Sequence, residues 1–327
     1  MNMPKVSVLM PVYKTNPQYL REAIDSILEQ TFTDFEFLIL DDCPSDKTVE
    51  EIIKKYDDKR IKYLRNDRNM GISDSRNKLI DLAVGEYLAV MDHDDISLPT
   101  RFAREVAFLD THPDVGVVST KFEQFPGKYK KNKNPRDDKD IKLALMRTSA
   151  ISHPAAMIRK SVLIENGIRY EKKFSPSEDY ALWCRLIKHT KFHNIPEILF
   201  KYRRHATNTS KIQSAEMTDT SHRIHAFVKR ENPELYQEFL TKATRTRRFC
   251  LFGGVPIITF VDRMEHHRVL LFDFIPLIHA DVDHSRTIIS LFGFLPILSV
   301  KANEYKTKVM LFNLLPVVSY KNSIKLR

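Results

Sequence analysis

Short apolar runs alternate with longer segments of helical periodicity along the first 120 residues of the chain. The run from Val6 to Met10 is apolar over most of its length, which predicts a buried strand. Asn16 and Pro17 follow, and they are the residue types that cap and open a helix. The apolar residues after them fall on one face of that helix, and they are Leu20, Ile24, Ile27 and Leu28.

The same alternation continues to about residue 110, and it predicts three more strands and three more helices. Repeated strand–helix units imply a mostly parallel sheet with right-handed crossovers, flanked by helices. The fold class is therefore expected to be α/β, of the Rossmann-like type that binds nucleotides. The strands are expected at 35–40, 61–64 and 86–90, and the helices at 49–56, from Ser73 to near Gly85, and from Pro99 to Leu109.

Residues 121–150 change character. The basic run at 128–135 predicts an exposed loop, and a solvated charge run is its simplest interpretation. Further on, Ser177 is expected to cap a helix that begins with Glu178 and Asp179. Acids in a first turn are favoured by the helix dipole, so their position alone requires no catalytic role.

The C-terminal segment contains a repeat of 20 residues. A Leu-Phe pair begins at positions 251, 271, 291 and 311, and a proline recurs at 256, 276, 296 and 316. A fixed period indicates small units stacked on one another. We expect an appendage of β-hairpin-like repeats with the prolines at edge positions, while short amphipathic helices on a bilayer are the alternative.

Composition limits the classes of protein that need to be considered. The length of 327 residues suits one large α/β domain plus an appendage. The cysteines Cys43, Cys184 and Cys250 are far apart, so neither a disulfide framework nor a zinc site is indicated. The net charge of +10 suits anionic partners, but no nucleic-acid module accompanies it, and we expect no nucleic-acid partner. Without a signal-peptide pattern or an 18-residue apolar run, a cytoplasmic location is expected.

Acidic residues follow two of the predicted strands. Asp41 and Asp42 end the second strand, and Asp92, Asp94 and Asp95 follow the fourth. The carboxyl edge of an open α/β sheet is where such folds bind ligands. Closely spaced carboxylates there suit a divalent cation with a diphosphate, although acids after strands are more often turns and caps.

Six groups of residues are informative when they are taken together and in order: 6–13, 23–31, 40–42, 69–71 with 76–77, 92–95 and 178–180. They resemble the family 2 glycosyltransferases of the GT-A fold, which invert the anomeric configuration. The resemblance covers roughly residues 4–210, and similar repeated tails occur in some transferases of bacterial surface polysaccharides. We expect a transferase domain at 1–210, a helical connector at 211–244 and the repeat region at 245–327.

The resemblance implies a donor site for a UDP-sugar. Pro11 and Tyr13 follow the first strand, where a ring can lie against a base, and Asp42 would accept the ring N–H of uracil. Asp41 is expected to be a turn or cap residue beside it. The loop at Gly71 leads to Arg76, which would contact ribose or diphosphate, unless it faces solvent as helical arginines commonly do. His153 and Arg203 complete the implied donor contacts.

The resemblance also implies a cation and a base. Asp94 would bind Mn²⁺ or Mg²⁺ directly, Asp92 would hold ribose or reach the metal through water, and His205 would be a metal or diphosphate ligand. Asp179 would be the general base that takes the proton of the acceptor hydroxyl, with Glu178 orienting the site. One base opposite the leaving group implies inversion.

The expected function is metal-dependent transfer of a sugar from a UDP-sugar to a glycan or lipid-linked saccharide in surface polysaccharide synthesis. The alternative is a catalytically silent nucleotide-sugar binder that acts in assembly through its repeats. For the repeats, attachment to the inner face of the cytoplasmic membrane and a homodimer contact or simple packing are expected equally.

Overall fold

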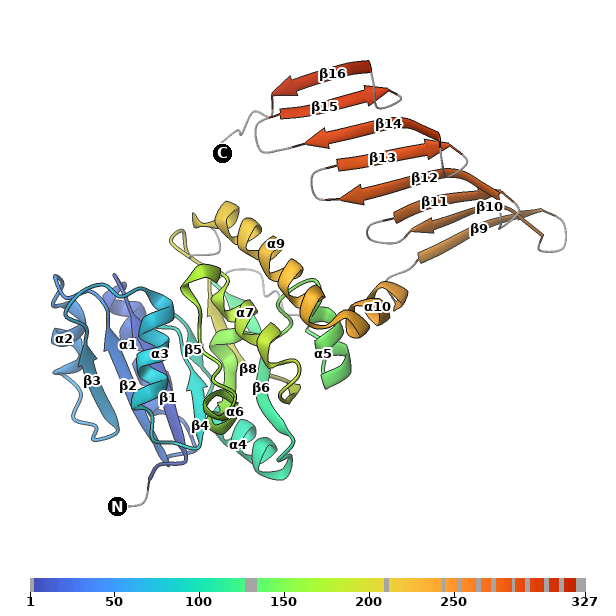
Figure 1. Ribbon diagram of the computed structural model, residues 1–327. Coiled ribbons are helices and arrows are strands. Elements are labelled where there is room, and N and C mark those ends of the chain that lie inside the picture. The colour runs from blue at the N-terminus through green and yellow to red at the C-terminus, as the bar shows by residue number, and fades with distance from the viewer. Residues whose placement is uncertain are drawn as a thin grey trace. The chain divides into compact units, whose positions relative to one another are not determined.

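The chain divides into two compact units, Met1–Leu235 and Tyr236–Arg327. The computed structural model describes residues 3–126, 134–208 and 212–242 together with the C-terminal strands (Figure 1). The basic loop expected at 128–135 falls mostly outside the described residues, as do the Leu-Phe turn positions of the repeats, Gly253, Asp273, Gly293 and Asn313.

The first unit is built on an eight-stranded sheet with the order β3-β2-β1-β4-β7-β6-β8-β5. The first four of these strands run parallel, as expected from the repeated strand–helix pattern. The strands are β1 (Val6–Val12), β2 (Phe35–Asp41), β3 (Ile61–Arg65), β4 (Tyr87–Val90), β5 (Ile96–Ser97), β6 (Val115–Phe125), β7 (Ala156–Arg159) and β8 (Lys191–Arg203).

The other half of the sheet adds two reversed strands, β7 and β5, to the mostly parallel arrangement that was expected. β7 is antiparallel to both β4 and β6, β6 and β8 are parallel, and β5 returns antiparallel along β8. The sheet is therefore mixed. β7 begins directly after a short 3-10 helix, η1 (His153–Ala155), and the chain enters it beside the carboxyl end of β4.

Helices flank the sheet where the periodicity predicted them, with small shifts at their ends. Asn16 caps α1 because its side-chain oxygen accepts the backbone N–H of Gln18 at 2.9 Å. The helix expected to begin at Ser73 instead begins after Gly71, whose φ of +82° is a conformation that glycine adopts without strain. The predicted helix at 49–56 ends at Ile53. The helices are α1 (Pro17–Leu28), α2 (Thr48–Ile53), α3 (Ile72–Leu82), α4 (Arg101–Thr111), α5 (Asp138–Leu145), α6 (Lys160–Glu165), η2 (Lys172–Phe174), α7 (Glu178–Leu186), α9 (Ser214–Glu231) and α10 (Pro233–Lys242).

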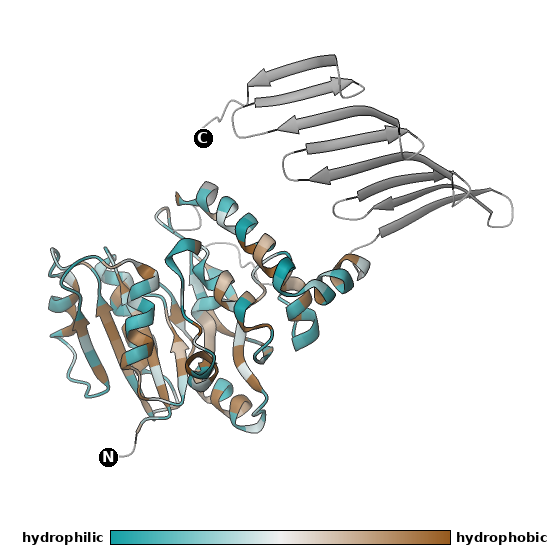
Figure 2. Cartoon of the chain, in the orientation of Figure 1, coloured by the Kyte–Doolittle hydropathy of each residue, from teal (hydrophilic) through white to brown (hydrophobic). Residues whose placement is uncertain are grey.

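The core lies between the central strands and these helices. Figure 2 shows hydrophobic residues concentrated on the central strands. Alternate residues of β1, from Val6 to Val12, form one cluster with the apolar faces of α1 and α4, while α3 packs against β1 and β2. Since β1 is buried throughout, its near-continuous apolar sequence follows from having helices on both sides.

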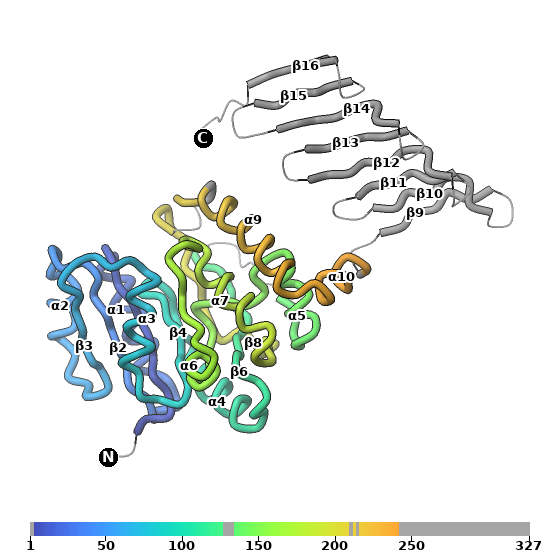
Figure 3. The backbone as a smooth tube through the Cα atoms, in the orientation of Figure 1, coloured from blue at the N-terminus to red at the C-terminus, as the bar shows by residue number. Residues whose placement is uncertain are grey.

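The helix α9 extends this unit beyond the sheet. It packs against α7 (Figure 3), and Ser177 Oγ lies 3.0 Å from Thr220 Oγ1 on α9. Ser177 occupies the N-cap position of α7, but its side chain makes no capping hydrogen bond. The predicted side-chain cap was therefore wrong, because the hydroxyl bonds to α9 instead. None of the helices in the described ranges combines the length and hydrophobicity needed to cross a bilayer.

In the second unit the described strands pair antiparallel with their sequence neighbours, from β9 to β16. The same register recurs in the units of the repeat: Leu251 pairs with Val255, Leu271 with Ile275, Leu291 with Leu295 and Leu311 with Leu315. The strands are β9 (Arg245–Leu251), β10 (Val255–Asp262), β11 (His266–Leu271), β12 (Ile275–Asp283), β13 (Arg286–Leu291), β14 (Leu295–Ala302), β15 (Lys306–Leu311) and β16 (Leu315–Lys321).

The repeated prolines do not all lie on edge strands, contrary to the prediction. Pro256, Pro276 and Pro296 lie on β10, β12 and β14, which have a neighbour on each side. A register shift lies next to each of these prolines and next to Pro316. A bulge interrupts the ladder locally, and it is a position within a sheet that tolerates a residue without an N–H.

A buried network fixes the return from α3 into β4. Glu36 accepts from Ser7 Oγ at 2.5 Å and from the backbone N–H of Val84 at 2.8 Å, and Ser7 Oγ accepts from the N–H of Gly85 at 2.8 Å. A Cβ at Gly85 would lie 2.6 Å from the backbone nitrogen of Ser7. The turn therefore has no room for a side chain at this position.

We predict that Gly85→Ala lowers the free energy of unfolding by about 2–3 kcal/mol, because backbone must move to admit the methyl group. Gly167→Ala is the matched control. It has φ of +59° and no atom within 4 Å of the new Cβ, so it should cost only about 1 kcal/mol of backbone strain. Urea denaturation measures both values. Equal losses in the two variants would show that crowding at Gly85 is not the cause.

Candidate functional site

Several elements bring acidic residues together at the carboxyl edge of the sheet. Met91 continues β4 with a backbone hydrogen bond to Leu9 O at 3.1 Å, and the acidic run follows. Asp95 is 1% exposed and accepts the backbone N–H of Arg203 at 2.7 Å. Burial, and then the neighbouring Asp94 and Asp92, raise the pKa of Asp95 well above its usual value. These residues, Asp92 to Asp95, form a turn that we call the acidic turn, and it is thus anchored to the end of β8.

Asp94 of this turn contacts His205, which follows the end of β8. The distance from Asp94 Oδ2 to His205 Nε2 is 2.7 Å, and both side chains are less than one-fifth exposed. Thr207 Oγ1 lies 2.8 Å from Nδ1 of the same ring, and the backbone N–H of His205 donates to Asn208 Oδ1 at 2.7 Å. A carboxylate oxygen and an imidazole nitrogen therefore lie side by side. Divalent transition metals accept this pair of ligand atoms. Across the described part of the chain, no three His, Cys, Asp or Glu side chains form a metal-binding group.

Arg76 joins the acidic turn to the start of α7. Its Nη1 donates to Glu178 Oε1 at 2.6 Å and its Nη2 lies 3.4 Å from Asp92 Oδ1. Its guanidinium also lies over the ring of Tyr170, 5.4 Å from the ring centre. Arg76 is 8% exposed and Glu178 is 5% exposed, so the ion pair is buried. Arg76 therefore lies in the protein interior, paired with two carboxylates, and does not face solvent.

The charged groups of this cluster shift one another's pKa values. Burial lowers the pKa of Arg76, but Glu178 and Asp92 outweigh it, and the net pKa is raised. Burial raises the pKa of Asp92, with Arg76 opposing it. Burial is the main cause that raises the pKa of Asp179 to about 6, and the negative charge of Glu178 is the second. The positive charge of Arg76 opposes both. Asp179 is half-buried in the first turn of α7, so it combines access with a pKa near neutrality.

Asp42 lies at the end of β2 and is 3% exposed. Its Oδ1 accepts from Asn66 Nδ2 at 2.7 Å and from the backbone N–H of Met70 at 2.8 Å. Its Oδ2 accepts the N–H of Gly71 at 2.9 Å. The carboxylate thus holds the loop between β3 and α3. Asp41 behaves as the predicted turn residue, since its Oδ1 accepts the N–H of Cys43 at 2.9 Å.

Pro11 and Tyr13 differ in access although they are close in sequence. Pro11 is buried within β1, whereas Tyr13 is 41% exposed just beyond the strand. Lys14 follows it with φ of +45°. Of the two, only Tyr13 presents a ring that a ligand can reach without rearrangement.

His153 and Arg203 are buried and engaged with protein groups. His153 Nε2 lies 2.8 Å from Tyr170 Oη, and burial, followed by the charge of Arg76, lowers the pKa of His153 well below its usual value. Arg203 Nε donates to the backbone oxygen of Asp94 at 2.6 Å, and its Nη2 pairs with Glu22. In this structure both side chains bond to neighbouring protein groups that hold the site residues in place.

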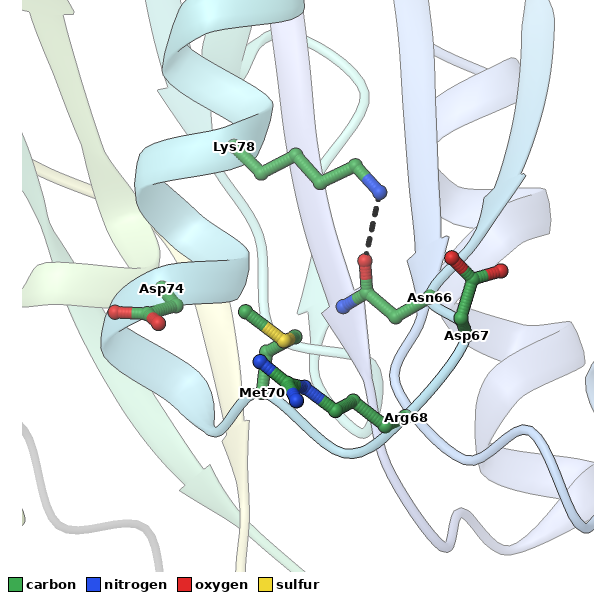
Figure 4. Close-up of a pocket in the computed structure, with 6 residues that line it drawn as sticks. All are labelled: Asn66, Asp67, Arg68, Met70, Asp74 and Lys78. Carbon is green, nitrogen blue, oxygen red and sulfur yellow. Dashed lines mark hydrogen bonds between the residues drawn. The ribbon is translucent and has the colours of Figure 1, made fainter.

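Sequence reasoning missed several residues that complete the site. Asn66, directly after β3, could have been found by the reasoning applied to Asp42, because it stands at the same sheet edge. Tyr170, Glu22 and Asn208 carry no pattern that separates them from other loop or helix residues. The loop after β3 also borders a surface depression of about 430 Å³ (Figure 4), which is lined by Asn66, Asp67, Arg68, Met70, Asp74 and Lys78.

We predict that Arg76→Met lowers the free energy of unfolding by about 3–5 kcal/mol, because it leaves the buried carboxylate of Glu178 without its partner. Adding Glu178→Gln to this variant should restore part of the loss, since the uncompensated charge is then removed. Urea denaturation of both variants and the wild type measures the effect. A double variant less stable than Arg76→Met would contradict the assignment.

Comparisons with known proteins show which sequences and structures this chain is similar to. The sequence pattern described as glycosyl transferase family 2 matches residues 7–167. An uncharacterized glycosyltransferase of Methanocaldococcus jannaschii is 38% identical over 210 residues, which cover 62% of this chain and 72% of that protein. The amylovoran biosynthesis glycosyltransferase AmsE of Erwinia amylovora is 26% identical over 204 residues, which cover 60% of this chain and 75% of AmsE.

Among solved structures, TarS 1–349 of S. aureus in complex with UDP-GlcNAc superimposes with a TM-score of 0.60 and 20% identity, covering 72% of this chain and 71% of that chain. At that identity the likeness concerns the fold alone. The sequence identity to the archaeal relative and the matched family pattern settle the classification: the chain belongs to glycosyl transferase family 2 and is a transferase with a GT-A-like α/β domain.

Proposed function

We propose that this chain transfers a sugar from a UDP-sugar to a glycan or lipid-linked saccharide acceptor in the synthesis of a surface polysaccharide. The observation that carries the proposal is the attachment of Asp92 and Glu178 to one buried arginine, because it brings the acidic turn after β4 to the start of α7. AmsE, a relative named for amylovoran biosynthesis, supports the acceptor class. TarS bound to UDP-GlcNAc supports the donor class.

On the donor side, Tyr13 and Asp42 are proposed to hold the base. The exposed ring of Tyr13 offers a flat surface, with Pro11 fixing the strand behind it. Asp42 offers a carboxylate oxygen at the end of β2, and Gly71 sets the turn that shapes the loop beside it. Buried hydrogen-bonding edges of a base require such partners.

Asp179 is proposed as the general base. An acceptor hydroxyl is a weak nucleophile, and a carboxylate within hydrogen-bond reach takes its proton as the oxygen attacks the anomeric carbon. A base with a pKa of about 6 is ionised at neutral pH and still basic enough for the transfer. One base acting in one displacement inverts the anomeric configuration, by analogy with glycoside hydrolysis. Glu178 keeps the pKa of Asp179 high and holds Arg76.

Asp94 and His205 are proposed to hold a divalent cation, Mn²⁺ or Mg²⁺, with Asp92 contacting it or the ribose. The converging carboxylate oxygen and imidazole nitrogen fit such an ion, and diphosphate oxygens and water would complete its coordination. When bound, the cation neutralises charge on the departing nucleoside diphosphate. Arg203 and His153 are proposed to contribute to the donor site through the contacts that position Asp94 and Arg76.

We predict that Asp179→Asn lowers kcat by about 10²–10⁴-fold, because it removes the proton acceptor. Asp94→Ala should lower turnover by about 10²-fold or more, and chelation by EDTA should do the same to the wild type. In the wild type, kcat/KM should fall about tenfold per pH unit below about pH 6, as Asp179 becomes protonated. Release of UDP from a panel of UDP-sugars, with acceptor and Mn²⁺ present, measures these effects.

Asp219→Asn is the control, because Asp219 is an exposed acid on α9. Its turnover should equal that of the wild type. Unchanged turnover in both site variants would reject the roles assigned here. A wild type that binds UDP but transfers no sugar would favour a nucleotide-sugar binder instead.

The repeat region is proposed to be a hairpin array that attaches the enzyme weakly to the cytoplasmic face of the membrane, where lipid-linked acceptors reside. Its sequence combines apolar runs with flanking Lys and Arg, and each basic residue near anionic lipid contributes about 1 kcal/mol. A homodimer contact is the alternative role.

We predict that the full-length chain co-sediments with liposomes containing anionic lipid, and that a chain ending at Thr241 does not. High salt should weaken the association, since its electrostatic part is screened. Equal partitioning of the two chains would contradict membrane attachment. A change in oligomeric state on truncation would then favour the dimer.

A further inference from the structure

Asn66 donates to Asp42, and Lys78 in turn donates to Asn66. Neither residue has a role in the function proposed above. We call them the amide clamp. Asn66 is 3% exposed and follows β3, whereas Lys78 is an exposed residue of α3. Figure 4 shows the Lys78 amine directed at the side-chain oxygen of Asn66. The Lys78 amine donates to this oxygen at 2.8 Å.

The clamp fixes which way the Asn66 amide faces. A lysine ammonium only donates hydrogen bonds, so the group facing it must be the amide oxygen. The amide nitrogen then faces Asp42, to which it donates at 2.7 Å, and it also lies 3.3 Å from Ser75 Oγ. The reverse orientation would set two donors against each other at Lys78 and two acceptors against each other at Asp42.

The hydrogen bonds on Asp42 leave one of its oxygens with spare capacity. Oδ1 accepts from Asn66 and from the backbone of Met70, and Oδ2 accepts from the backbone of Gly71. An ionised carboxylate offers about four lone-pair positions. Within the described residues, three are used by these donors, so Oδ2 can accept one more N–H.

We propose that the amide clamp sets the nucleobase specificity of the donor site, by holding Asp42 as an acceptor that favours uracil over cytosine. The ring nitrogen of uracil between its two carbonyls carries a proton and donates to such an acceptor. The corresponding nitrogen of cytosine carries a lone pair, which an acceptor repels. Asn66 and Lys78 are positioning residues in this proposal, which rests on the function proposed above and specifies its donor class.

The test is titration calorimetry with UDP and with CDP. The wild type should bind UDP at least tenfold more tightly than CDP. In Asn66→Leu, UDP affinity should fall about 10–30-fold and CDP affinity less than about threefold, because the ring N–H of uracil donates to this acceptor and the ring nitrogen of cytosine does not. Lys78→Met should reduce the UDP preference by about 3–10-fold, and Lys78→Arg, which retains a donor, should restore most of it.

Lys54→Met is the matched control, since Lys54 is an exposed lysine at the C-cap of α2, paired with Glu50. It should leave both affinities unchanged. The kcat at saturating donor should stay within about twofold in both Lys78 variants, so that the effect appears in binding. If Asn66→Leu does not fold, the two Lys78 variants decide the question.

Equal weakening of UDP and CDP in the clamp variants would overturn the proposal and leave the transferase function intact. An unchanged UDP preference in those variants would do the same. Failure of the wild type to bind either nucleotide would overturn the proposed function as well.

Discussion

The arrangement of the site depends on one guanidinium that neutralises carboxylates from two distant parts of the chain. Arg76 lies 102 residues before Glu178 in sequence, yet the two groups meet at 2.6 Å in the protein interior. Burying either charge alone would be costly, so each requires the other. The strand end that carries Asp92 and the helix start that carries Asp179 are therefore held in a fixed relation. The same contacts of Arg76 shift the pKa values of Asp92 and Asp179.

A second buried arginine, Arg203, also binds the acidic turn. Arg203 ends β8, and it binds Asp94 through that residue's backbone oxygen while its own backbone N–H binds Asp95. Its side chain also reaches Glu22 on α1. The acidic turn is thus attached to the sheet, to α1 and to α3 at once. Such bracing holds repelling carboxylates close together.

Local patterns in the sequence predicted the elements and the acidic strand ends, because each depends on a few neighbouring residues. The Asn16 cap and the four parallel strands are examples. The direction of β7 could not be predicted in this way, because strand pairing is decided by contacts between distant segments. The burial of Arg76 and the hydroxyl contact of Ser177 with α9 were missed for the same reason. The placement of Asn66 was accessible, since it follows β3 as Asp42 follows β2.

The recurring register of the second unit has an evolutionary consequence. Because successive 20-residue units pair through equivalent residues and carry a register shift at the same proline, duplicating or deleting one unit would leave its neighbours' hydrogen bonding intact. Each added pair of strands would widen the sheet by about 9.6 Å, twice the spacing between neighbouring strands. The gene can thus lengthen or shorten this part of the product in discrete steps, without altering the residues proposed to bind the donor.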